Sequence, residues 1–229
     1  MAFNSCARRI EVVQVFEPQT IVEQPIIFRE LPFLNATQPK EKKLIVIDPG
    51  HGGKDFGTEA PVKPSFKEKN LNLVTARLLK GYLDQMGYRT LLTRNEDFFV
   101  PLDKRASFAN IRNSDLFVSI HYNSAPSVNA EGIEVFYFRT DNDLMRASAS
   151  KSLADSVLKY LLDATDAKSR GVKHGNLAVV RKTTMPAILV ESGFLTNEKE
   201  LLKLKDPAYI KSIAWGIAQG IQAYLNSEL

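Results

Sequence analysis

The sequence predicts an α/β fold, a single domain with a largely parallel twisted sheet that is flanked by helices on both faces. From residue 41 onward, short apolar runs of strand length alternate with longer helical segments. Several of these runs are apolar on both faces, which is typical of strands covered on two sides. The chain has 229 residues, of which 44% are hydrophobic and 24% charged. This composition fits one globular domain with a tail.

The expected elements follow from these patterns. The segments expected to be strands are 44–48 (LIVID), 90–93, 116–120 (LFVSI), 133–138, 177–180 and 187–191 (AILVE). The segments with helical spacing are 68–86, 148–162 and 207–225. In the first helix, Leu71, Val74, Leu78 and Tyr82 are expected on one buried face, and Gly87 is expected to end it. Ligands of such sheets gather at the carboxyl ends of the strands.

Residues 1–40 differ in character from the rest. Four prolines recur there every seven residues, at Pro18, Pro25, Pro32 and Pro39. Since proline blocks helices and central strands, we expect an extended arm or linker. The opening MAFNSCARRIEVVQVF has no apolar segment of signal-peptide length, so no export signal is visible.

Charge and cysteine content narrow the classes of partner. The net charge is +4 with no cluster of lysine and arginine, so we expect no nucleic acid partner. No apolar run reaches transmembrane length, so no membrane span is expected. The single cysteine, Cys6, cannot form a disulfide within the chain. We expect a monomer.

Two of the three histidines stand at strand ends, where α/β sites form. His51 lies in IDPGHGG directly after one strand, and His121 lies in SIHYNS after another. The glycines around His51 let the backbone turn tightly around a small ligand. Considered alone, such a histidine is more often a solvated loop residue. His174, in GVKHGN, is interpreted as a surface residue.

A catalytic zinc ion usually takes three protein ligands and leaves one position for water. Glu68 is the candidate carboxylate because it opens the first long helix, where the connection returns to the edge of the sheet. An equal alternative is a capping box with Ser65, in which Glu68 only satisfies backbone donors.

Glu191 ends the buried strand AILVE, where a carboxylate is costly unless it is paired, coordinated or functional. It is a candidate acid/base, and the alternative is a salt bridge to a lysine or arginine. Asp48 either orients a ligand imidazole or simply ends its strand.

Four ordered motifs carry a family resemblance: IVIDPGHGGKDFG, EKNLNL, SIHYNSAP followed by GIEVFYF, and MPAILVESGFLTN. Over about residues 43–226 the chain resembles the zinc-dependent N-acetylmuramoyl-L-alanine amidases of bacterial cell walls, with their type 3 catalytic domain. The resemblance implies that residues 41–229 form the catalytic domain, with Zn²⁺ on His51, Glu68 and His121 and with Glu191 as acid/base. Asn123 and Glu134 sit in matching motifs as candidate substrate-binding residues, although core or strand-end roles are equally open.

The implied reaction is cleavage of the amide between N-acetylmuramic acid and the L-alanine of the stem peptide, by a zinc-activated water. The implied partner is peptidoglycan or a muramoyl-peptide, and the implied location is the periplasm or cell envelope. Some amidases of this type carry a blocking helix after the GIEVFYF strand. Here only residues 139–147 separate that strand from the next helix, so we expect an open site and no obligatory activator.

Two other functions stay open. Ser148-x-x-Lys151 matches a serine nucleophile motif, with Ser127-Val128-Asn129 and Lys182-Thr183-Thr184 as loose companions, which would indicate a serine-type carboxypeptidase of stem peptides. The other is a non-catalytic wall-binding module of the same fold, which would not need the three ligands and Glu191 together.

Overall fold

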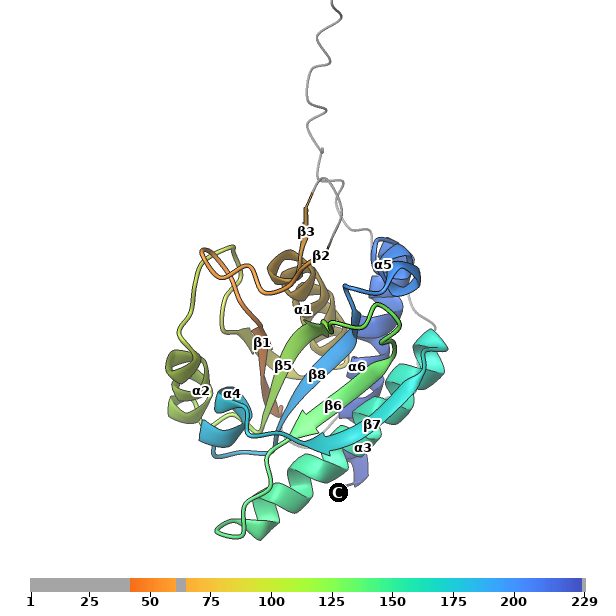
Figure 1. Cartoon of the computed structure of the whole chain (residues 1–229). Coiled ribbons are helices and arrows are strands. Elements are labelled where there is room, and N and C mark those ends of the chain that lie inside the picture. Colours follow the sequence, from red (N-terminus) through yellow and green to blue (C-terminus); the bar gives the residue numbers. More distant parts are fainter. Residues whose placement is uncertain (1–41, 61–64, 228–229) are drawn as a thin grey trace, which may run out of the picture. The chain divides into compact units, whose positions relative to one another are not determined.

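The computed structural model describes residues 42–60 and 65–227, so the predicted arm at 1–40 lies outside the described residues. A six-stranded sheet forms the centre, in the order β4-β1-β5-β8-β6-β7 (Figure 1). Its strands are β1 (Leu44–Pro49), β4 (Arg89–Leu92), β5 (Leu116–Asn123), β6 (Ile133–Tyr137), β7 (Ser169–His174) and β8 (Ala187–Phe194). The pairing of β6 with β8 is antiparallel and the other pairs are parallel. The predicted, largely parallel sheet is confirmed.

Helices cover both faces of this sheet, as predicted. One face carries α1 (Glu68–Gln85), α3 (Leu144–Thr165) and α6 (Pro207–Ser227), and the other carries α2 (Leu102–Ile111) and α4 (Ala178–Lys182) (Figure 1). Alternate residues of β1 point to the two sides. Ile45 and Ile47 join the larger apolar core with α1, α3 and α6, while Val46 joins the smaller one beneath α4. A further short helix, α5 (Glu198–Leu204), follows β8.

Two structural expectations are wrong. Residues 177–180 were expected to be a strand, but residues 178–182 form the helix α4. Val179 and Val180 are buried there, and a four-residue apolar run fits either type of element. In α1, Leu71 and Leu78 are buried as expected, but Val74 is 48% exposed. The buried face includes Asn72 and Thr75 in its place.

The sequence patterns did not predict several of the helices and strands. These are α2, α5, β7 and the small antiparallel pair β2 (Glu59–Ala60) and β3 (Phe66–Lys67). The end of α1 is as expected, since Gly87 has a φ of 91° directly after the cap at Met86. Among the described helices, none combines the length and apolar character needed to cross a membrane.

Candidate active site

The loop after β1 brings His51 to the carboxyl edge of the sheet. His51 itself has a φ of 59°, and Gly52 and Gly53 follow with φ of 129° and 57°. Gly50 lies against the imidazole of His121, and a Cβ on Gly50 would stand 2.2 Å from that ring. Glycine is therefore required at Gly50 because the backbone of one histidine's loop touches the side chain of the other histidine.

His51, Glu68 and His121 meet at this edge. Oε1 of Glu68 lies 3.2 Å from Nε2 of His51 and 2.9 Å from Nδ1 of His121. One potential ligand atom from each residue lies within 4.8 Å of the others. Glu68 is 3% exposed, whereas the two histidines are partly exposed. The structure thus brings together the three residues that the sequence suggested as metal ligands.

Two backbone amides hold the carboxylate of Glu68 in place. Oε2 accepts a hydrogen bond from the Thr58 amide (2.9 Å), and Oε1 also accepts one from the Tyr122 amide (3.2 Å). Burial alone would raise the pKa of Glu68, but the hydrogen bonds from His121 and His51 outweigh it and hold that pKa well below the usual range. Glu68 is therefore an anion at neutral pH.

The alternative capping box is not formed. The N-cap of α1 is Lys67, which makes no side-chain capping bond, and the Ser65 hydroxyl donates to Glu59 instead. The Glu68 carboxylate instead bonds the two histidines and the amides of Thr58 and Tyr122, which lie outside α1, so the capping interpretation of this residue is wrong.

Asp55, which the sequence reasoning missed, orients His51. Its Oδ1 lies 2.8 Å from Nδ1 of His51 and also accepts the Gly57 amide at 3.1 Å. The hydrogen bond between Asp55 and Nδ1 of His51 leaves Nε2 of His51 directed at Glu68. Burial would lower the pKa of His51, but hydrogen bonds to Glu68 and Asp55 raise it above the usual value. The available signal was a carboxylate four residues after the histidine in one glycine-rich loop.

Asp48 does not orient an imidazole. Its Oδ1 accepts from Arg105 (2.8 Å) and Thr93 (2.5 Å), and its Oδ2 accepts from Ser119 (2.8 Å). Asp48 and Arg105 are 0% and 2% exposed, so they form a buried ion pair below the site. The orienting role suggested for Asp48 is wrong, because its carboxylate already has these partners.

Two buried arginines hold the His51 loop from behind. Arg105 donates to the carbonyls of Pro49 (2.6 Å) and His51 (2.7 Å). Arg94 donates to the carbonyls of Pro49 (3.0 Å) and Gly50 (2.8 Å). Burial and the nearby charge of Arg105 lower the pKa of Arg94 to about 10, so the Arg94 guanidinium remains charged at neutral pH. Neither arginine was identified from the sequence.

Glu191 faces the same site from the neighbouring strand. It pairs with His121 across β5 and β8 and with Glu134 across β8 and β6. Its Oε2 is buried and has no hydrogen-bond partner among the described residues. Burial, followed by the negative charges of Glu68 and Glu134, raises the pKa of Glu191 well above its ordinary value. The alternative of a salt bridge is wrong within the described part of the chain.

Asn123 and Glu134 form a polar network beside Glu191. Asn123 donates from Nδ2 to Oε1 of Glu134 at 2.7 Å. Oε2 of Glu134 accepts from Arg170 (2.9 Å) and Lys173 (2.5 Å), and these cations lower the pKa of Glu134 despite its burial. Asn123 lines the site cavity, while Glu134 supports it from the adjacent strand. Arg170 and Lys173 had not been singled out in the sequence.

The cavity around this cluster has a volume of about 400 Å³. Its lining residues are His51, Asp55, Gly57, Thr58, Glu68, His121, Tyr122, Asn123, Ser124 and Glu191. His174 lies outside it, exposed at the end of β7, where its Nδ1 accepts from the Arg139 amide. The interpretation of His174 as a surface residue agrees with this position.

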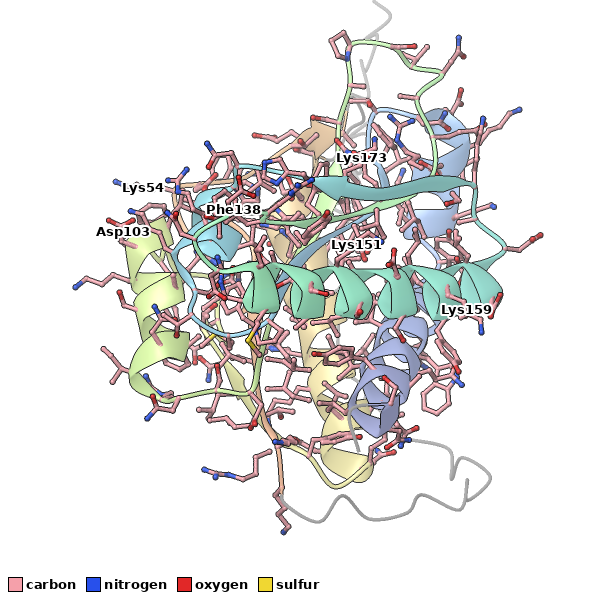
Figure 2. The ribbon with its side chains drawn as sticks, turned by 90° about the horizontal axis from the view of Figure 1, so that it is seen from below. Lys54, Asp103, Phe138, Lys151, Lys159 and Lys173 are labelled. Carbon is pink, nitrogen blue, oxygen red and sulfur yellow. The ribbon has the colours of Figure 1, made fainter. Side chains whose placement is uncertain are left out.

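The serine motif lies elsewhere. Ser148 and Lys151 are in α3, which packs beside β7 (Figure 2). Lys151 donates a hydrogen bond to Asp155 at 2.7 Å. Lys182, of the third loose motif, pairs instead with Asp103. The two lysines of these motifs therefore have carboxylate partners and, among the described residues, do not contact a serine hydroxyl.

The donor set fits a zinc ion. Two imidazoles and one carboxylate are a known ligand combination of zinc hydrolases, and a buried anionic carboxylate between two imidazoles suits a divalent cation. Glu191, whose Oε2 has no hydrogen-bond partner among the described residues, lines the same cavity.

Comparison with known proteins defines the family. Residues 45–223 match the N-acetylmuramoyl-L-alanine amidase family Amidase_3, and the chain belongs to this family. It is 34% identical to the uncharacterized protein YqiI of Bacillus subtilis over 195 residues, covering 85% of this chain and 91% of YqiI. It is 31% identical to the N-acetylmuramoyl-L-alanine amidase AmiC of Neisseria meningitidis, covering 82% of this chain but only 54% of AmiC.

A solved structure agrees with both the fold and the family. The catalytic domain of CwlV, an N-acetylmuramoyl-L-alanine amidase from Bacillus (Paenibacillus) polymyxa var. colistinus, superposes with a TM-score of 0.74 at 40% identity. The match covers 80% of this chain and 98% of that domain.

Proposed function

We propose that this protein hydrolyses the amide bond between N-acetylmuramic acid and the L-alanine of peptidoglycan stem peptides. The observation that carries the proposal is one cavity that is lined by three ligand-capable residues and by Glu191, whose buried Oε2 has no hydrogen-bond partner among the described residues. Family membership supplies the substrate class, and a peptidoglycan substrate implies a location at the cell envelope.

In this proposal His51, Glu68 and His121 hold Zn²⁺. When bound there, the ion supplies Lewis acidity toward the amide carbonyl and makes water more acidic. Asp55 keeps the Nδ1 proton of His51 engaged, so that Nε2 remains available as a ligand atom.

Glu191 moves the proton. Its carboxylate accepts a proton from the attacking water and then donates it to the alanine nitrogen as the amide breaks, so no covalent intermediate is needed. A pKa raised above the ordinary carboxyl value suits a group that must both accept and donate a proton in one turnover. Asn123 at the cavity wall, held by Glu134, is placed to contact the substrate.

We also propose that no activator is required. Strand β6 ends at Tyr137 and α3 begins at Leu144, and the described residues between them form no helix that would cover the cavity.

The test combines metal content with product analysis. The purified protein should bind about one zinc per chain and, without a second protein, should release stem peptides with a free L-alanine amino group, identified by mass spectrometry. His51→Ala and His121→Ala should lose the zinc, while His174→Ala, a histidine outside the cavity, should keep it. Full zinc retention in both ligand variants, or cleavage at a different bond, would refute the proposal.

A further inference from the structure

A second cavity lies beside the candidate active site, with a volume of about 620 Å³. It is formed by two segments, the loop after β5 and the stretch that runs from the end of β8 into α5. Its lining residues are Val128, Asn129, Glu131, Leu195, Thr196, Asn197, Glu198, Lys199 and Leu201.

The walls of this cavity continue from those of the active site. The Leu195 amide donates to the carbonyl of Asn123 at 2.9 Å, and Asn123 lines the active-site cavity. The Ala125 amide donates to Oγ1 of Thr196 at 3.1 Å, and further out Nδ2 of Asn197 donates to the Val128 carbonyl at 3.0 Å. These bonds hold the two segments together, so a substrate leaving the active site along β5 and β8 reaches the second cavity.

The chemistry of the lining suits a peptide that carries charges of both signs. Leu195 and Leu201 are buried and give an apolar floor. Glu198 and Lys199 are exposed side by side on α5, and neither has an ion-pair partner among the described residues. The lining contains no aromatic ring on which a flat sugar face would stack.

The direction of the substrate follows from the role of Glu191. The group that protonates the leaving alanine nitrogen must lie within hydrogen-bond reach of it, so the peptide side of the substrate lies on the Glu191 side. From Glu191 to Leu195 the strand advances by about 13 Å. An α-linked extended peptide covers this span in about four residues, but the γ-linkage of D-glutamate adds two carbon atoms to the backbone, so the second and third residues of the stem peptide reach it. The residues that follow L-alanine in the stem peptide therefore extend to the second cavity.

We propose that this second cavity binds the stem peptide beyond its L-alanine. Lys199 pairs with the free α-carboxylate of the γ-linked D-glutamate, and Glu198 pairs with the ammonium group of the diamino acid that follows. This inference rests on the proposed amidase function and names the part of the substrate that gives it specificity.

The test reverses one charge and uses binding as well as turnover. In Lys199→Glu, the affinity of the zinc-loaded protein for the free tripeptide L-Ala-γ-D-Glu-L-Lys, measured by calorimetry, should fall roughly tenfold, since an attraction becomes a repulsion. The KM for a muramoyl-pentapeptide should rise by a similar factor with kcat little changed. Turnover of the minimal substrate N-acetylmuramoyl-L-alanine should be unaffected.

Lys205→Glu is the matched control, because Lys205 is exposed just after the same helix but outside the cavity lining. It carries the same change in charge and should behave as wild type. Lys199→Ala should give a smaller loss than Lys199→Glu, and circular dichroism should show both variants folded.

Three results would overturn the inference: equal weakening in both charge reversals, unchanged tripeptide binding in Lys199→Glu, or a selective loss of binding to a glucosamine–muramic acid disaccharide without peptide. Tripeptide binding is measured without turnover. Failure of the proposed hydrolysis therefore shows in the wild-type product analysis, whereas failure of this inference shows in the binding difference between variants.

Discussion

Glu191→Gln separates a catalytic role from a structural one more sharply than any other single change. Glutamine keeps the size and hydrogen-bonding reach of the side chain but cannot accept a proton from water. If Glu191 is the acid/base, the rate of amide hydrolysis should fall by roughly 10²–10⁴, the usual worth of a positioned proton-transfer group.

The structure also fixes the expected effect on stability. A Glu191 that held a buried cation would cost about 3–5 kcal/mol on removal, because the partner would be left uncompensated. Here its Oε2 has no partner in the described residues, and burial together with the charges of Glu68 and Glu134 raises its pKa. A raised folded-state pKa means that ionised Glu191 destabilises the fold above its ordinary pKa, so the neutral glutamine should not lower stability at pH 7.

The assay therefore has three readouts on one variant: amide hydrolysis, zinc content and the melting temperature of the zinc-free protein. The expected result is a zinc-loaded protein with a melting temperature no lower than wild type and little turnover. Glu198→Gln is a suitable control for the change in charge in the hydrolysis of the minimal substrate. Near wild-type turnover in a stable, zinc-loaded Glu191→Gln would remove Glu191 from the mechanism.

Two further changes test the surroundings of the site. Ser148→Ala should leave amidase turnover near wild type, because Ser148 lies on α3 and its motif partner Lys151 bonds Asp155. A β-lactam adduct that forms on wild type and disappears in this variant would contradict the prediction. Glu134→Gln should lower the free energy of unfolding at pH 7 by about 1–3 kcal/mol through loss of charged hydrogen bonds. Since the pKa of Glu134 is lowered by Lys173 and Arg170, this difference should be complete above about pH 4.5, the unfolded value, and should shrink as the pH falls through the folded value. Denaturant unfolding at stepped pH checks it, and a difference that persists unchanged in acid would refute the assignment.

The strands and helices that carry the site were predictable because each is long and strongly patterned. The runs LIVID, LFVSI and AILVE are buried on both faces and became β1, β5 and β8. The errors fall where the pattern is short or polar. Residues 177–180 are only four apolar residues, too few to distinguish a strand from one helical turn.

The misplaced Val74 has a different cause. The buried face of α1 includes Asn72, which donates to the Gly50 carbonyl at 3.1 Å, and Thr75, which bonds the Tyr122 hydroxyl at 2.7 Å. Because these polar residues bond groups of the candidate site, the buried face of α1 is less apolar than an amphipathic helix pattern predicts. A rule that equates buried with apolar fails at such positions.

The candidate ligands could be named from the sequence, but their supports could not. Arg94 and Arg105 act through hydrogen bonds to backbone carbonyls, and only the fold defines where those carbonyls lie. Arg105 is only 2% exposed. From the sequence alone, a charged side chain like this one is expected at the surface, because its hydrogen-bond acceptors are known only from the structure. These hydrogen bonds join residues that are far apart in the sequence, since Arg105 and His51 are separated by 54 positions.

The order of the strands explains why residues so distant in sequence converge. Strands β1, β5 and β8 are consecutive neighbours and parallel, so their carboxyl ends lie at one edge. His51 follows the first, and His121 and Glu191 stand opposite each other on the other two. Glu68 joins them because α1 begins there after the connection from β1. The candidate metal ligands and Glu191 thus come from different elements of the fold, which allows the two buried arginines to fix the His51 loop without restraining Glu191.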